Sequence, residues 1–237
     1  MNAKNIFIGI PLFFLGIVVF SSCSGNWLQD DEDNLPNAFS FGQLQKTESG
    51  VAYFLQDDAT TMAPLDAIVA ADSLVGHRYY LEGRIITGAE KIAGYDYTMR
   101  IDLVMSVTEH PIIYLDDNQS SDKYGNGHIL FSNAFVTGRK YLNLFYDFYT
   151  GETTSMLHDF HLTFSASQNK RIDADIIYAE FHHQTPNDAK DVPHSAIASY
   201  DISEIIAAHT KDFKLVVSYR EHGYNTPLIK ELVIKVD

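Results

Sequence analysis

Hydrophobic and polar residues alternate with a period of two along most of the chain from Phe39 onward, a pattern typical of half-buried β-strands. The clearest stretch, residues 99–107, places Met99, Ile101, Leu103, Met105 and Val107 on one face. In the first part of the chain the alternation predicts strands at residues 39–46, 51–55, 78–87 and 99–107. Gly83 marks a bend or bulge within the third of them.

The connection at residues 57–74 is less regular, and its segment 64–71 is predicted to form a short helix. A small Greek-key barrel has five short strands, and the predicted strands with one irregular insertion suit this size, so residues 38–109 are predicted to form a barrel of the OB type. His110 and Pro111 interrupt the strand series, and residues 116–127 are rich in turn-forming residues. We therefore place a domain boundary near residue 110.

The second half of the chain returns to the same alternation. Strands are predicted at residues 128–137, 140–149, 157–165, 176–183, 196–200, 213–221 and 228–236. One helix is predicted at residues 203–209, with Ser203 as its N-cap. About seven short strands make a β-sandwich, so residues 110–237 are predicted to be a sandwich and the fold class all-β.

The amino terminus reads as a targeting segment. Lys4 precedes an apolar run at residues 6–20, which is too short for a typical membrane-spanning helix but suits a signal peptide at residues 1–22. The run ends at Ser21, Ser22 and Cys23, which resemble a bacterial lipobox, with Phe20 where Leu is commoner. This resemblance implies a lipid on the Cys23 thiol and anchoring of the chain to a membrane.

Residues 23–37 form a polar segment with four consecutive acids, Asp30 to Asp33. Like charges packed together disfavour compact structure, so this segment is predicted to be an extended tether. The expected location is the cell envelope, with the protein anchored to the outer membrane by its lipid.

The charge balance and the single cysteine exclude or disfavour several classes of partner and site. The chain has 17 basic against 31 acidic residues, a net charge of −14, which disfavours nucleic acid as a partner. One cysteine excludes an internal disulfide and a cysteine-based metal site. The sequence contains no G-x-S-x-G elbow, no H-E-x-x-H helix and no P-loop, so we predict no catalytic residue and no cofactor.

Ten histidines raise the question of a metal site. His158 and His161 lie on opposite faces of their predicted strand, and so do His182 and His183 of theirs. A site built from His161, one of His182 or His183, and an Asp is conceivable, but ordinary surface histidines are the favoured interpretation because metal sites need converging ligands. We predict no metal.

An aromatic face is the candidate ligand surface. On the strand at 140–149, one face carries an apolar core set, while Tyr141, Phe145 and Tyr149 make the opposite face unusually apolar. This face either binds a ligand or is covered by the other sheet or domain. Packing is the favoured alternative because a sandwich must bury its inner faces.

The assembled features resemble the NigD-like family of Bacteroidetes lipoproteins. The likeness rests on Ser21 to Cys23 with Asp30 to Asp33, on residues 76–85 and 99–107, and on the closing residues 232–236. It implies a lipid anchor, an acidic tether, an OB-type barrel and a carboxy-terminal sandwich, and it supplies no site residues.

The leading hypothesis is a lipid-anchored binding or accessory protein, without catalytic activity, that contacts an envelope protein, peptide or glycan. One alternative is an envelope hydrolase that uses Asp or Glu carboxylates. Another is a structural or immunity-type lipoprotein, which the family's association with bacteriocin gene clusters implies.

Overall fold

The computed structural model describes residues 37–236, apart from 67, 69–70, 152–157, 170, 186–191 and 222. The expected signal peptide, Cys23 and all of the tether before Asn37 lie outside these residues, and Asn37 already begins the first strand. None of the helices in the described part of the chain has the length and apolar character needed to cross a bilayer.

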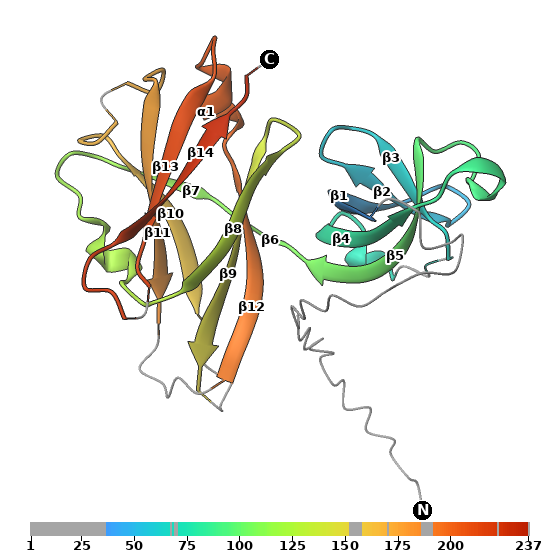
Figure 1. Ribbon diagram of the computed structural model, residues 1–237, viewed down its shortest axis with the longest axis horizontal. Coiled ribbons are helices and arrows are strands. Elements are labelled where there is room, and N and C mark those ends of the chain that lie inside the picture. The colour runs from blue at the N-terminus through green and yellow to red at the C-terminus, as the bar shows by residue number, and fades with distance from the viewer. Residues whose placement is uncertain are drawn as a thin grey trace, which may run out of the picture.

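The predicted all-β fold is confirmed: a barrel and a sandwich lie next to each other (Figure 1). The barrel is closed by five strands in the order β1-β2-β3-β5-β4. Their bounds are β1 Asn37–Lys46, β2 Ala52–Gln56, β3 Thr61–Pro64, β4 Arg78–Ile85 and β5 Tyr97–Ser106. Its core contains Leu44, Phe54, Met62, Leu81 and Met99.

Gly83 lies at a bulge, as expected. The pairing of β4 with β5 shifts register between Glu82 and Gly83. A Cβ atom at Gly83 would lie 2.1 Å from the carbonyl oxygen of Arg100, so the close approach of the two strands requires glycine.

The helix predicted at residues 64–71 is wrong for the residues that the structure describes there. Pro64 instead ends β3, which pairs in parallel with β5. The short helical turns of this domain lie elsewhere, at η2 Asp72–Leu74 and η3 Gly88–Glu90. Pro64 is tolerated at the end of a strand because its missing N–H removes no bond from the strand interior.

The sandwich consists of a five-stranded sheet, β14-β13-β11-β10-β7, and a four-stranded sheet, β6-β12-β9-β8. The strands are β6 Thr108–His110, β7 Ile112–Leu115, β8 Leu130–Thr137, β9 Tyr141–Thr150, β10 Asp159–Ser165, β11 Ile176–Gln184, β12 Val192–Asp201, β13 Phe213–Tyr219 and β14 Leu228–Ile234. Alternate residues of β9, from Leu142 to Tyr146, point into a core shared with β10, β11 and β13.

Two short strands, β6 and β7, were not expected. They pair in parallel with β12 and β10, one in each sheet, so the turn at Pro111 between them passes from one sheet to the other. The barrel therefore ends at Ser106 and the sandwich begins at Thr108, close to the boundary expected near residue 110.

The helix of the second domain, α1 Ser203–Ala207, is shorter than predicted. Its N-cap is Ile202 rather than Ser203. The Asp201 carboxylate accepts hydrogen bonds from the backbone N–H of Ser203, 3.0 Å, and from its hydroxyl, 2.6 Å. An Asp just outside the helix thus satisfies the N–H of the first helical residue.

A buried ion pair joins the two domains. Arg78 of β4 forms a bidentate pair with Asp57, which follows β2, and the Arg78 side chain is fully buried. The guanidinium also donates to Asn143 and Ser199 of the sandwich and lies 4.0 Å from the ring centroid of Tyr141. Beside it, an apolar cluster contains Phe41 and Val107 with Ile197.

Candidate functional site at one end of the sandwich

Two of the three residues of the candidate ligand face are covered by the barrel. Tyr141 is 8% exposed beneath Arg78. Phe145 packs edge-on against Phe41, at 6.0 Å, and Tyr80, at 5.3 Å. At these positions the face is therefore covered by packing rather than open to a ligand, because the barrel docks on the outer face of β9.

Tyr149 differs from its two partners. It lies beyond the barrel contact, near the end of β9, and is 48% exposed. The structure places it at a hollow in the end of the sandwich, where it joins His183 and several residues that the sequence pattern did not single out.

The histidines of β11 pair with His161 of β10 and with His158, just before β10, on opposite faces of the sheet. His161 and His182 are directly opposite each other on the outer face, and the Tyr124 ring packs against both. On the inner face, Nδ1 of His158 lies 2.8 Å from Nε2 of His183. Within the described ranges, no three His, Cys, Asp or Glu side chains converge as metal ligands.

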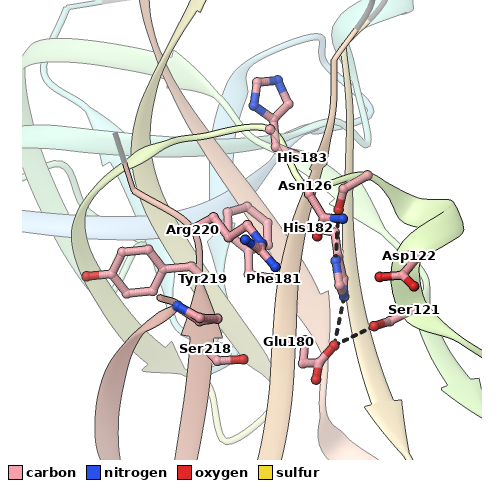
Figure 2. A pocket seen from close by; sticks show the side chains of 13 residues that line it. Ser121, Asp122, Asn126, Glu180, Phe181, His182, His183, Ser218, Tyr219 and Arg220 are labelled. Atoms are coloured by element: carbon pink, nitrogen blue, oxygen red, sulfur yellow. Dashed lines mark hydrogen bonds and ion pairs between the residues drawn. The ribbon is translucent and has the colours of Figure 1, made fainter. Parts of the chain in front are cut away.

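A polar groove of about 240 Å³ crosses the outer face of the five-stranded sheet (Figure 2). One wall is the turn η4 Ser121–Tyr124 with the glycine-rich segment after it, and the floor is β11 beside the end of β13. Figure 2 shows the Glu180 carboxylate between Ser121 and His182, with Arg220 on the neighbouring chain segment.

Three side chains contact the Glu180 carboxylate. Its carboxylate accepts from the Ser121 hydroxyl at 2.7 Å and from Nε2 of Gln168 at 3.2 Å, and it lies 3.3 Å from Nε2 of His182. These contacts, that with His182 first, lower the pKa of Glu180 to about 2, although partial burial opposes the shift. The carboxylate is therefore ionised throughout the physiological range.

His182 connects this carboxylate to the turn above it. Its Nδ1 lies 3.1 Å from the carbonyl oxygen of Gly125, and because a carbonyl only accepts, Nδ1 carries a proton. Its Nε2 faces the Thr163 hydroxyl at 3.1 Å as well as Glu180. The imidazole is 8% exposed and thus fixes η4 and the following loop onto the sheet.

A second hollow, of about 460 Å³, adjoins the groove at the end of the sandwich. It is lined by His128, Ile129, Leu130, Tyr149, His183, Thr185 and Glu221. His183 borders both hollows, and the segment containing Gly127 and His128 runs between them.

Gly127 allows this segment to lie close against β11. Its N–H donates to the carbonyl oxygen of His183 at 2.8 Å. A Cβ atom at this position would lie 2.2 Å from the Thr185 side chain and 2.7 Å from that carbonyl oxygen. Any larger residue would push the segment off the strand and change both hollows.

The arrangement is suited to binding rather than to proton transfer. A general acid needs a carboxyl group that holds its proton near neutral pH, and a general base needs one that takes a proton readily. Glu180, with a pKa lowered to about 2, does neither efficiently. The groove offers a fixed negative charge, and the second hollow offers an aromatic wall with a polar rim.

The sequence pattern missed residues that are brought together by contacts between segments far apart in the chain. Ser121 belongs to a segment expected only to be a turn, and Glu180 and Thr185 to a strand and its end. Nothing local indicates that η4 folds back over β11, since the contact spans 59 residues of sequence.

The fold and this site define a two-domain all-β protein with a ligand-sized hollow at the end of its sandwich. Residues 111–234, just over half of the chain, match the model of the NigD-like C-terminal beta sandwich domain. The chain belongs to the NigD-like family, as its sequence features indicated.

Similar solved structures share this architecture. A protein of unknown function from Bacteroides vulgatus superposes with a TM-score of 0.63 at 13% identity, covering 84% of this chain and 90% of that one. A "Putative lipoprotein" from Bacteroides fragilis gives 0.53 at 12% identity, covering 85% and 98%. A NigD-like immunity protein from Bacteroides caccae gives 0.53 at 12%, covering 84% and 97%. No curated protein matches the sequence.

Proposed function

We propose that this protein is a lipid-anchored accessory protein of the cell envelope that acts by binding an envelope protein or glycan, without catalysing a reaction. The observation that carries the binding role is the Glu180 cluster, a partly exposed carboxylate kept ionised by its hydrogen-bond donors at the floor of a groove. Membership of the NigD-like family and the likeness to the "Putative lipoprotein" of B. fragilis support the anchored, accessory character.

The anchor is tested by replacing its attachment atom. In Cys23→Ser the hydroxyl cannot take the thioether-linked lipid, so we expect the protein to move from the membrane pellet to the soluble fraction and to stop incorporating alkyne-labelled fatty acid. Asn26→Ala, three residues further on, is the matched control and is expected to stay in the pellet with its label. Equal membrane retention of both variants would contradict the anchor.

The binding role is tested from inside the groove. A photo-cross-linking residue at Ser218, which lines the groove, is expected to capture a discrete envelope component in intact cells. The same residue at Ser167, in a turn outside the groove, serves as the control. If Ser218 yields no adduct beyond those obtained at Ser167, the groove does not carry the function.

A second candidate function, an immunity-type role, is favoured by the structural likeness to the NigD-like immunity protein of B. caccae. It predicts that a strain that secretes a toxin becomes sensitive to its own culture fluid when the gene is deleted. The intact gene is expected to restore resistance to that fluid. Unchanged growth of the deletion strain in that fluid would remove this candidate.

A further inference from the structure

The hollow at the end of the sandwich contains polar groups that have no partner among the described residues. The hydroxyls of Tyr149 and Thr185 and the carboxylate of Glu221 form no hydrogen bond or ion pair with any residue of the described chain. All three line the same cavity of about 460 Å³. Sites for small molecules combine apolar and aromatic walls with a few polar groups of this kind.

His183 forms the floor of the hollow and is held in place by hydrogen bonds and by ring stacking. His183 is 2% exposed, and its Nδ1–H donates to the carbonyl oxygen of His128 at 3.2 Å. Its Nε2 is thereby left to accept from Nδ1 of His158 at 2.8 Å. The ring also stacks on Phe160 at 4.5 Å. A floor fixed in this way needs little ordering when a ligand arrives.

The mixture of apolar and polar residues in the lining limits the classes of ligand that the hollow can bind. Tyr149 and Leu130, 48% and 49% exposed, form apolar walls, but four of the seven lining residues that the structure describes are polar. An acyl chain would leave the Thr185 hydroxyl and the Glu221 carboxylate desolvated and without a hydrogen bond. An extended peptide would need a regular strand edge, and β8 shifts register between Phe131 and Asn133.

A sugar ring has the matching properties. Its C–H face is apolar and packs on an aromatic ring, while its hydroxyls donate to carboxylates and exchange hydrogen bonds with side-chain hydroxyls. The unpaired carboxylate of Glu221 and the net charge of −14 disfavour an acidic sugar.

We propose that this hollow binds a neutral or amino sugar ring of an envelope glycan, stacked on Tyr149, with its hydroxyls bonded to Glu221 and Thr185. The inference rests on the proposed binding function and names the ligand class for the hollow that adjoins the groove.

The purified protein is titrated with glucose, galactose, N-acetylglucosamine, glucosamine and glucuronate, and binding is measured from the chemical shifts of its amide groups. The protein is then applied to a printed panel of neutral, amino and acidic glycans. We expect a neutral or amino sugar to shift the signals of His128, Leu130 and Glu221, with glucuronate and acidic glycans weaker. Tyr149→Ala should weaken binding at least about tenfold, as for central aromatic contacts. Tyr149→Phe should keep most of it.

Two further variants complete the test. Glu221→Gln is expected to weaken binding several-fold, whereas Tyr114→Ala, which removes a 53% exposed tyrosine outside the hollow, should leave it unchanged. Thermal unfolding of each variant separates loss of binding from loss of folding.

The inference is overturned if neither the sugars nor the panel bind, if acidic glycans bind best, or if Tyr149→Ala binds as the parent does. Selective binding of fatty acid or peptide in the hollow would also overturn it. Because membrane anchoring and cross-linking from Ser218 do not involve Tyr149, they would survive such a result and leave the proposed function standing.

Discussion

Glu180 shows how one side chain can fix a loop that lies far away in sequence. Its carboxylate binds Ser121 of η4 directly and, through His182, the carbonyl of Gly125. Since charge-assisted hydrogen bonds of this kind strengthen with ionisation, the turn is held most firmly when Glu180 is charged.

The folded-state pKa of about 2 lies below the ordinary 4.5, so the Glu180 cluster stabilises the fold above pH 4.5 and loses this contribution as the pH falls towards 2. Glu180→Gln should lower the free energy of unfolding by about 1 to 2 kcal/mol at pH 7, a value reduced for partial solvation. Urea unfolding as a function of pH measures it, and the deficit should vanish near pH 2.

The control for this substitution is Glu231→Gln on β14, which removes a solvent-exposed pair with Lys214. An exposed pair contributes about 0 to 1 kcal/mol. A deficit of Glu180→Gln that is independent of pH between 2 and 7 would show that its carboxylate does not hold the turn.

At the scale of elements, the hairpin between β8 and β9 shares the contact with the barrel with β12. Gly138 at its tip has a φ of +57°, and a Cβ atom there would lie 2.1 Å from the carbonyl oxygen of Asp57. The hairpin therefore needs glycine for its turn and for its close approach to the barrel.

Gly138→Ala is expected to destabilise the protein by about 1 to 3 kcal/mol more than Gly223→Ala. Both glycines have a positive φ, +57° and +90°, but nothing lies within 4 Å of a Cβ atom at Gly223. The difference between the two therefore isolates the clash with Asp57 from backbone strain. Equal losses in chemical unfolding would mean that the hairpin tip does not press on the barrel.

At the scale of the whole molecule, the pair formed by Arg78 and Asp57 connects the barrel to the sandwich. The guanidinium lies between the rings of Phe41, 5.0 Å away, and Tyr141. It also bonds to Asn143 and Ser199 of the opposite domain. A buried charge pair is costly to form but much costlier to break on one side.

Arg78→Met should destabilise the protein by about 3 to 5 kcal/mol, because Asp57 is left buried without its cation. In calorimetry we expect the barrel and sandwich to unfold in separate transitions. Arg78→Met combined with Asp57→Leu should recover most of the loss, since no lone charge remains. A double variant no more stable than the single one would show that packing, not charge, joins the domains.

The alternation of hydrophobic residues fixed most of the strands because it depends only on which side of each strand faces a core. The bulge at Gly83 was also visible locally, as a glycine inside a strand pattern. The strands β6 and β7 and the helix boundary at Ile202 were not, since short elements leave too few residues to show a period.

The sequence by itself determined the all-β class and the two-domain layout, because periodicity and chain order carry that information, and its resemblance to known sequences indicated the family. Only the tertiary structure decided that Tyr141 and Phe145 are covered by the barrel while Tyr149 borders a hollow. It alone joined Ser121 to Glu180 and placed Thr185 and Glu221 beside Tyr149. The physical reason is that a strand's pattern specifies which face is apolar, whereas what covers that face depends on contacts between residues far apart in the chain.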